Sequence, residues 1–309
     1  MTPDDILSHP SRILTDAQRR SFFRDGYLTL PGWVERSMLG RLQTALGEIL
    51  ELCRERPATD EDFTLAPGHA PATPRLVTAR RVHDLHPTFW DYAARSALAD
   101  LGSDLVGPDV KFREAYINFK RATEGEEVSW HQDFPFFPLT NRAMITTLTY
   151  LDDVTPEMGP IEVVPGSHRG AVYDHYDRDG RWSGRLSDAD YEQAVRSRAL
   201  PQAGPAGTVV IFDSCTLHGS APNTTRRDRP VLVIGFAAAD AFPYTATPPS
   251  MYSKRTWQIV RGRPASAAHF EAVRCRVPPD WSHNAYIPPD WPEKSNAGIP
   301  ASRKPPGMM

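Results

Sequence analysis

An H-x-D triplet constrains this chain of 309 residues more than any other short segment. It lies in Val128 to Pro138, VSWHQDFPFFP, where His131 and Asp133 stand near the end of an apolar, aromatic run. If this run is a β-strand, its period of two sends both side chains to one face. They would then form half of a metal site, although an isolated H-x-D is more often a pair of surface residues.

A second pattern downstream supplies a third candidate ligand. The segment Gly207 to Asn223, GTVVIFDSCTLHGSAPN, reads as a β-branched strand and a polar break, followed by His218 and Ser220. Arg229 then opens another apolar strand, PVLVIGF. Two imidazoles and one carboxylate on one face are typical of non-haem Fe(II) oxygenases, which keep positions open for a cosubstrate and dioxygen. An Arg on a neighbouring strand can bind a carboxylate in a planar fork.

Three segments extend these patterns: WHQDF at residues 130–134, YLDDVTPEMGPIEVVPGSH at residues 150–168 and HGSAPNTTRRDR at residues 218–229. In order and spacing they resemble the phytanoyl-CoA dioxygenase family of Fe(II)- and 2-oxoglutarate-dependent oxygenases, to which ectoine hydroxylase also belongs. The resemblance runs from about Leu14 to about Phe242. It implies an enzyme that uses O2 and 2-oxoglutarate to hydroxylate, or otherwise oxidise, a small molecule, with succinate and carbon dioxide as products.

The resemblance also implies roles for individual residues. Fe(II) would be bound by three side chains, namely His131, Asp133 and His218. Arg229 would pair with the far carboxylate of 2-oxoglutarate, helped by further polar groups: Ser220, Asn118 and Lys120. A solvated charge at a strand end is the alternative for Lys120. The substrate pocket would be lined by aromatic residues near the triplet, namely Trp130, Phe134 and Phe137, whereas His168 would lie outside the ligands in a structural PGSH turn.

Helices are expected mainly in the first third of the chain. One helix is expected from about Asp16 to Asp25. Thr15 and Gln18 form its capping box, and Gly26 stands where a C-terminal glycine belongs. The remaining expectations for this part are helices at about Arg36–Cys53 and His86–Val106, short strands at Tyr27–Gly32 and Arg75–Val82, and a loop over Arg54–Ala72.

Short strands separated by turns are expected after the helices, and this order indicates a β-sandwich. The strands not yet named are expected at Val110–Ala122, Ala143–Asp152 and Ile161–Val164. The resemblance makes the sandwich a double-stranded β-helix, the cupin-like jelly roll, which is mainly β with helices packed on one outer face. In this fold the strands carrying His131 and His218 would meet at one mouth of the barrel.

A single oxygenase domain is expected over residues 1–242, with N-terminal helices over 15–106 and the jelly-roll core over 110–238. A Pro-rich extension covers residues 243–309 and is expected to pack to about Trp291 and to be disordered from about Lys294. The charged stretch at residues 171–204 could be a lid, a binding loop or a plain surface loop. Substrate identity is expected to depend partly on it.

The composition limits the possible partners. A formal net charge of -3 and a pI near 6.4 argue against a nucleic acid or an anionic membrane as partner. No signal peptide and no apolar run of membrane-spanning length is visible, so a cytoplasmic location is expected. The expected partner is a small-molecule substrate, and the oligomeric state is open.

Two alternative functions come from other classes of protein. One is a cupin-like isomerase or hydrolase that binds zinc or another divalent metal through the same three ligands and would need neither oxygen nor Arg229. The other is a family member that has lost catalysis and serves as a binding module, which would be expected to lack a ligand. Frequent Ala, Arg, Pro and Gly are compatible with a GC-rich bacterial source, and therefore with an enzyme of secondary metabolism.

Overall fold

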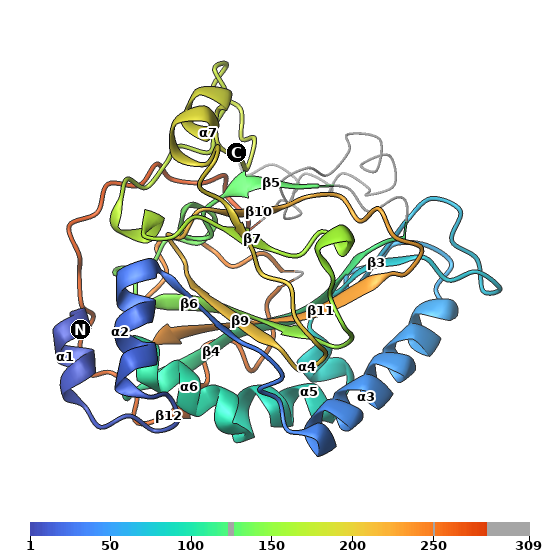
Figure 1. Ribbon diagram of the computed structural model, residues 1–309, viewed down its shortest axis with the longest axis horizontal. Helices are drawn as coiled ribbons and strands as arrows, with labels where there is room; N and C mark the ends of the chain where they lie inside the picture. The colour runs from blue at the N-terminus through green and yellow to red at the C-terminus, as the bar shows by residue number, and fades with distance from the viewer. Residues whose placement is uncertain (123–126, 250, 283–309) are drawn as a thin grey trace, which may run out of the picture.

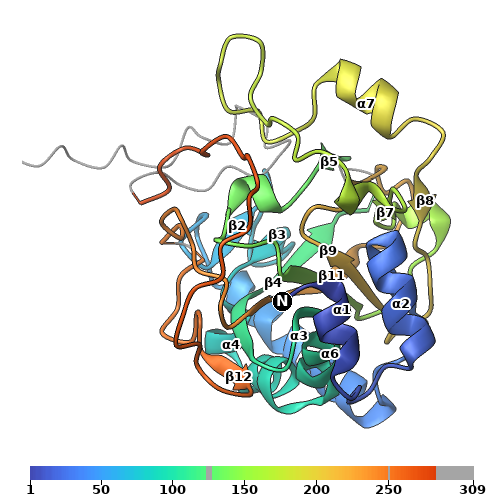
Figure 2. The same ribbon diagram turned by 90° about the vertical axis from the view of Figure 1, so that its left-hand side faces the viewer.

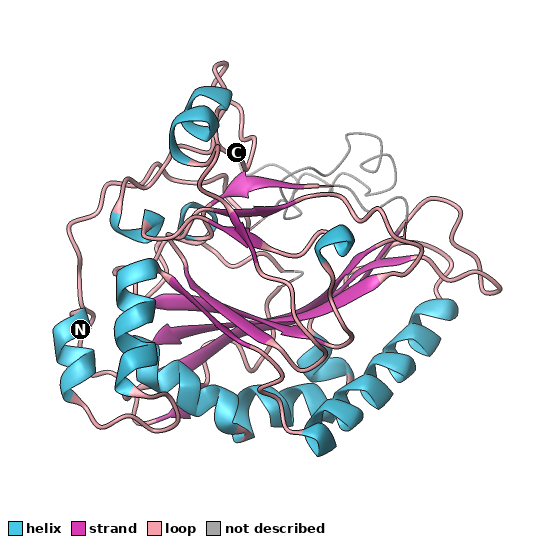
Figure 3. Cartoon of the chain, viewed as in Figure 1, coloured by secondary structure: helices cyan, strands magenta, loops and turns pink. Residues whose placement is uncertain are grey.

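The computed structural model describes residues 1–122, 127–249 and 251–282, and its main feature is a pair of antiparallel β-sheets (Figures 1 and 3). In pairing order, the larger sheet contains β1 (Tyr27–Leu30), β9 (Val209–Asp213), β6 (Met144–Tyr150), β11 (Arg229–Ala238), β4 (Val110–Lys120), β3 (Leu76–Ala79) and β2 (Phe63–Leu65), with β12 (Ile259–Arg261) paired to β4. The smaller sheet contains β5 (Val128–His131), β10 (His218–Ser220), β7 (Glu162–Val163) and β8 (Leu200–Pro201). The predicted fold class, a jelly roll with flanking helices, is confirmed.

Both faces of the larger sheet are apolar, and each face contacts a different hydrophobic core. On β11, Leu232 and Ile234 belong to the core shared with the helices, whereas Val231 and Val233 belong to a second core. This second core also contains Val163 of the smaller sheet, so it fills the space between the sheets. Because successive side chains of a strand point to opposite faces, one apolar strand serves both cores.

The helices lie mostly along the outer face of the larger sheet, where α3, α5 and α6 are seen in Figure 1. Their bounds are α1 (Pro3–Ser8), α2 (Asp16–Asp25), α3 (Arg36–Arg54), α4 (Val82–Leu85), α5 (Pro87–Trp90) and α6 (Ala97–Val106). The capping box predicted for α2 is confirmed, because the Thr15 and Gln18 side chains each accept from the other's backbone N–H. Gly26 ends the helix at φ 80, the left-handed conformation that glycine adopts most easily.

Two predictions for this region are wrong. The expected loop over Arg54–Ala72 contains β2, which pairs with β3 and buries Phe63 completely. The expected helix over His86–Val106 is interrupted after a π-helical turn at Asp91–Arg95. Ser96 is extended there and its Oγ accepts a hydrogen bond from Leu98 N–H at 3.1 Å, which caps a new helix instead of continuing the old one.

Part of the 171–204 region covers the outer side of the smaller sheet. In both views α7 (Asp188–Ala194) lies on the far side of this sheet from α3 and α6 (Figures 1 and 2). The C-terminal segment returns to the triplet, because the buried Trp281 donates its Nε1–H to the Phe136 carbonyl at 3.0 Å. The expected packing limit at Trp291 and the expected disorder from Lys294 lie outside the described residues.

A membrane-spanning element was not expected from the sequence. Within the described ranges, none of the helices combines the length and the apolar character needed to cross a bilayer.

Candidate metal centre and cosubstrate site

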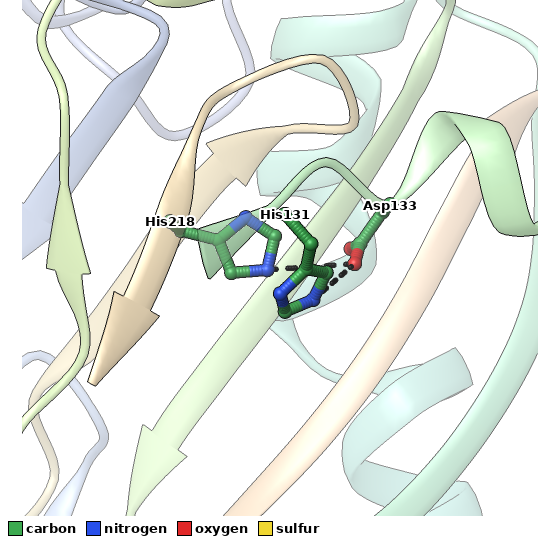
Figure 4. Close-up of side chains that lie close together, drawn as sticks. All are labelled: His131, Asp133 and His218. Atoms are coloured by element: carbon green, nitrogen blue, oxygen red, sulfur yellow. Dashed lines mark ion pairs between the residues drawn. The ribbon is translucent and has the colours of Figure 1, made fainter. Parts of the chain in front are cut away.

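The three predicted metal ligands come together between the sheets. His131 ends β5 and His218 begins β10, and the two residues pair directly in the antiparallel register. Asp133 Oδ1 lies 3.7 Å from His131 Nε2 and 3.5 Å from His218 Nε2 (Figure 4). The possible ligand atoms all lie within 4.8 Å of one another, so the group could hold one metal ion.

Backbone carbonyls fix how both imidazoles are presented. His131 Nδ1 lies 2.7 Å from the Ser129 carbonyl, and His218 Nδ1 lies 2.9 Å from the Thr216 carbonyl. Since a carbonyl can only accept, each Nδ1 carries a proton, which leaves Nε2 as the ring nitrogen available to a metal. The outer hydrogen bonds hold the rings with Nε2 toward Asp133.

The charges at the site also suit a metal. Burial and the neighbouring His218 lower the pKa of His131 to about 3, so this ring is neutral at neutral pH. Burial acts to raise the pKa of Asp133, but the imidazoles and a hydrogen bond from Thr146 Oγ1 at 2.6 Å outweigh it and lower the pKa. Neutral imidazole and ionised carboxylate are the forms that ligate a metal.

Asp133 reaches the site in a different way from the one predicted. The triplet was expected to be one strand, but β5 ends at His131 and Asp133 has helical backbone angles, φ -72 and ψ -34, before a 3-10 turn at Phe134–Phe136. The carboxylate is therefore presented by a turn. Strand alternation therefore identified the correct pair of residues, although a turn and not alternation brings Asp133 to the site.

Gln132, between the two ligands, is fully buried and points the other way. Its backbone N–H donates to His175 Nε2 at 3.1 Å, and its Nε2 donates to the carbonyls of Cys215 at 2.7 Å and Ala171 at 3.0 Å. Its Oε1 accepts from Tyr173 N–H at 2.8 Å. The start of the 171–204 region and the segment before His218 are therefore both bonded to the triplet.

Arg229 is buried at the start of β11, with 7% of its surface exposed. Its Nε and Nη1 atoms are buried without a hydrogen-bond partner, and no carboxylate of the described residues forms an ion pair with it. Burial lowers its pKa to about 10, against the opposing effect of Tyr150, so the guanidinium stays charged at neutral pH. An anionic ligand would stabilise this cation, because an unpaired buried charge raises the free energy of the folded protein.

Lys120 and Ser220, both predicted to help hold the cosubstrate, contact each other. Lys120 Nζ lies 2.5 Å from Ser220 Oγ, and it also donates to the carbonyls of Ser220 and Ala221. Lys120 is 5% exposed, so the alternative of a solvated strand-end charge is wrong. Asn118, two residues earlier on β4, accepts from Thr78 Oγ1 at 3.0 Å and is half-buried.

The predicted pocket aromatics are divided among three places. Phe137 lines a pocket together with Arg113, whose guanidinium lies 4.7 Å from the ring centroid. Phe134 belongs to the core beneath the larger sheet. The Trp130 ring lies 6.4 Å from Tyr191 of α7, on the outer side of the smaller sheet, so the structure does not bring it to the metal ligands.

Three residues around the ligands were not predicted, namely Thr146, Gln132 and His175. Thr146 is one of three Thr residues on β6, with Thr147 and Thr149, and only the folded structure shows which of them bonds Asp133. His175 is the one histidine in the 171–204 stretch, a signal that was visible in the sequence. Burial lowers its pKa to about 4, so it accepts from Gln132 as a neutral ring.

Comparison with known proteins supports this geometry. The sequence profile of the family described as "Phytanoyl-CoA dioxygenase (PhyH)" matches residues 22–231, a range that includes the three ligands and Arg229. A probable alpha-ketoglutarate-dependent hypophosphite dioxygenase of Stutzerimonas stutzeri is 32% identical over 231 residues, which is 73% of this chain and 79% of that protein. L-proline trans-4-hydroxylase of Streptomyces griseoviridis is 30% identical over 271 residues, 80% of this chain and 95% of that protein.

A solved structure shows the same fold. The crystal structure of EctD from S. alaskensis with bound Fe matches with a TM-score of 0.64 and 24% identity, covering 85% of this chain and 88% of that one. The fold, the converging His-Asp-His group and the profile match agree with one another. The chain therefore belongs to the phytanoyl-CoA dioxygenase family and is an Fe(II)- and 2-oxoglutarate-dependent dioxygenase.

Proposed function

We propose that this enzyme hydroxylates, or otherwise oxidises, an unactivated C–H bond of a small molecule, with Fe(II) bound by His131, Asp133 and His218. The observation that carries the proposal is the convergence of these three side chains within 4.8 Å, with both imidazoles oriented by backbone carbonyls. In the hydroxylation, one oxygen atom of O2 enters the substrate C–H bond, and the other enters succinate as 2-oxoglutarate loses carbon dioxide. Bound Fe(II) supplies this oxidation chemistry.

The protein's own contribution is position and charge. The carbonyls of Ser129 and Thr216 hold the imidazoles, and Thr146 holds the carboxylate. Arg229 then pairs with the far carboxylate of 2-oxoglutarate, which supplies the anion that its buried guanidinium lacks. Fixing these groups in advance lowers the cost of ordering them during the reaction.

Further polar groups complete the proposed cosubstrate site. Ser220 Oγ is held by Lys120 close to His218, and we assign both residues to binding 2-oxoglutarate. Asn118 lies on the same face of β4 as Lys120, because the two residues are two positions apart on one strand. We assign Asn118 the same role, and Phe137 the role of lining the substrate pocket.

Relatives support oxidation of a small molecule, since one is named for hydroxylating L-proline and another for oxidising hypophosphite. The expected setting in bacterial secondary metabolism and the cytoplasmic location stay proposals. The same holds for the division into an oxygenase domain at 1–242 and an extension.

A test of the metal and cosubstrate sites needs no substrate. Fe(II) and then 2-oxoglutarate are added without oxygen, and the weak visible charge-transfer band of the chelate is recorded. We expect the band in the wild type and its loss in His131→Ala. His168→Ala is the matched control, because His168 bonds the Phe23 carbonyl outside the ligand group and should leave the band in place.

Circular dichroism of each variant establishes that the fold is retained. A band that persists in His131→Ala would contradict the ligand assignment. A wild type that binds zinc tightly and forms no band would instead favour the cupin-like isomerase or the binding module.

A further inference from the structure

The turn that presents Asp133 lies outside the strand pairing that supports the two histidines. His131 and His218 pair with each other across β5 and β10, whereas Asp133 lies beyond the end of β5. Thr146 bonds its carboxylate, and within the turn its carbonyl accepts from Phe136 N–H at 3.1 Å. The position of Asp133 therefore depends on the contacts that hold the turn.

Phe136 joins this turn to both ligands of the triplet. Its ring lies 5.6 Å from the His131 ring and 5.0 Å from the Trp182 ring, in edge-to-face contacts. The side chain is buried, and a Cβ on Gly184 would lie 3.2 Å from its ring, so the space around it is closely filled. A displacement of Phe136 would reach His131 through the ring and Asp133 through the backbone of the turn.

Trp281 holds Phe136 from the C-terminal segment. Its Nε1–H donates to the Phe136 carbonyl at 3.0 Å, and its ring lies 5.7 Å from the Trp182 ring at an angle of 81°. The whole side chain of Trp281 is buried. Because an indole N–H can only donate, this hydrogen bond also fixes how the Trp281 ring is oriented.

The segment that carries this tryptophan is fixed at its other end as well. Arg276 Nη1 lies 3.0 Å from Asp174 Oδ2, and the guanidinium lies 3.8 Å from the centroid of the Tyr176 ring. The Tyr176 hydroxyl donates to the Val277 carbonyl at 2.8 Å. Asp174 and Tyr176 flank His175, which accepts from the backbone of the triplet. The C-terminal segment is therefore bonded to the ligand turn and to the loop beside it.

These contacts lie partly outside the range that the family profile covers. The profile matches residues 22–231, which include the ligands and Phe136 but not Trp281. Family membership therefore predicts the metal ligands and does not by itself predict the tryptophan that holds their turn.

We propose that Trp281 is a positioning residue for the metal centre, and that it acts on the two ligands of the triplet through Phe136. Trp182 contributes the shape of its ring, since its Nε1 is buried without a hydrogen-bond partner in the described part of the chain. The proposal rests on the ligand assignment made under the proposed function. It makes the C-terminal extension part of the support of the metal centre, so residues 1–242 alone would not contain the complete site.

The test separates the N–H group of Trp281 from its ring. Trp281→Phe keeps an aromatic side chain and removes the donor, so we expect about threefold to tenfold weaker Fe(II) binding. The charge-transfer band should also shift, because its energy depends on how the ligands surround the iron. Both quantities are measured in the full-length protein by titrating Fe(II) without oxygen at saturating 2-oxoglutarate.

Two variants of Trp182 show the opposite dependence. Trp182→Phe keeps the ring contact with Phe136 and loses only an unpaired N–H group, so it should bind Fe(II) as the wild type does. Trp182→Ala loses the ring and should weaken Fe(II) binding at least as much as Trp281→Phe. Co(II) added without 2-oxoglutarate or oxygen gives a second readout, since the visible spectrum of Co(II) reports the ligand geometry without turnover, and it should shift in Trp281→Phe and Trp182→Ala alone.

Trp90→Phe is the matched control. It makes the same change at another buried tryptophan, which packs on Phe112 in the core shared with the helices. It should lower the stability of the protein and leave the Fe(II) affinity and both spectra unchanged.

An unchanged Fe(II) affinity and unshifted spectra in Trp281→Phe would overturn the positioning role, and so would equal losses of affinity in Trp281→Phe and Trp90→Phe. If Trp281→Phe did not fold, equal Fe(II) affinities in Trp182→Ala and Trp182→Phe would overturn it. The proposed function would stand in each case, provided that the wild type forms the band and His131→Ala abolishes it. A missing band in the wild type would overturn the proposed function and the positioning role with it.

Discussion

Lys120 Nζ lies 2.5 Å from Ser220 Oγ, and this contact joins β4 of the larger sheet to β10 of the smaller sheet. The same ammonium group donates to the carbonyls of Ser220 and Ala221. A buried ammonium group with several acceptors therefore connects the two sheets. The connection lies beside the metal centre, because Ser220 is two residues after His218.

Replacing this lysine should affect both stability and cosubstrate binding. We expect Lys120→Met to lower the free energy of unfolding by about 1–3 kcal/mol, because Ser220 and Ala221 lose a charged donor. It should also weaken 2-oxoglutarate binding more than Ser220→Ala does, as measured by titrating the charge-transfer band. Arg121→Met is the control, since Arg121 pairs with Asp228 instead. Equal 2-oxoglutarate affinity in Lys120→Met and wild type would leave Lys120 a purely structural role.

The unpaired guanidinium of Arg229 should destabilise the apoprotein, and binding of 2-oxoglutarate should restore that stability. We expect Arg229→Leu to weaken 2-oxoglutarate binding by about 2–5 kcal/mol. In the absence of metal and cosubstrate it should raise the free energy of unfolding by about 1–3 kcal/mol, because a buried unpaired charge is removed. Urea denaturation of the apoprotein and titration of the band measure the two effects. A variant that is less stable and binds 2-oxoglutarate normally would contradict the assignment.

Thr146 should control metal affinity through Asp133. Thr146→Val keeps the shape of the side chain and removes the hydrogen bond to Asp133 Oδ2, so we expect about 10–100-fold weaker Fe(II) binding. The matched control is Thr149→Val on the same strand, whose hydroxyl bonds the Tyr92 hydroxyl at 2.9 Å on the helix side. That variant should lose stability and keep its metal affinity. Identical metal affinities for the two variants would show that Thr146 does not orient the carboxylate.

Asp213 should make stability depend on pH. Burial raises its pKa to about 7, whereas an unfolded Asp titrates near 3.9. Between these values the unfolded chain releases a proton that the folded chain keeps, so this group's contribution is complete below about pH 4 and is lost as the pH rises through 7. The loss should amount to about 2–4 kcal/mol, and Asp213→Asn should abolish it.

Urea denaturation of the apoprotein at several pH values measures this effect. Asp100→Asn is the control with the opposite sign, because the Arg261 hydrogen bond lowers the pKa of Asp100 and its contribution is lost only in acid. A wild type and an Asp213→Asn variant with parallel pH profiles would rule out the buried carboxyl as the cause.

Much of the fold could be predicted because its signals are local. The capping box of α2 lies within four residues, and the apolar run of β11 is continuous in the sequence. Other features depend on distant partners. The strand β2 is three residues long and is defined by its pairing to β3, and the break at Ser96 replaces an otherwise continuous helical pattern by a cap.

In the candidate site, too, some residues could be predicted from local sequence and others could not. His131, Asp133, His218 and Arg229 were predictable because their residue types and order are distinctive. The turn that presents Asp133 and the contact of Trp281 with Phe136 were not, because such features depend on the folded arrangement of the chain. The wrong prediction that Trp130 lines the substrate pocket has the same cause, since the orientation of the strand decides which aromatic residue faces the ligands.

Gln132 has a consequence for how this region opens. Its four hydrogen bonds tie the triplet to His175, Tyr173 and Ala171 on one side and to Cys215 on the other. None of these bonds can break alone without leaving a buried polar group unpaired. The amide protons of Gln132 and Tyr173 should therefore exchange with solvent in one shared opening event, in which the 171–175 segment detaches cooperatively from the triplet.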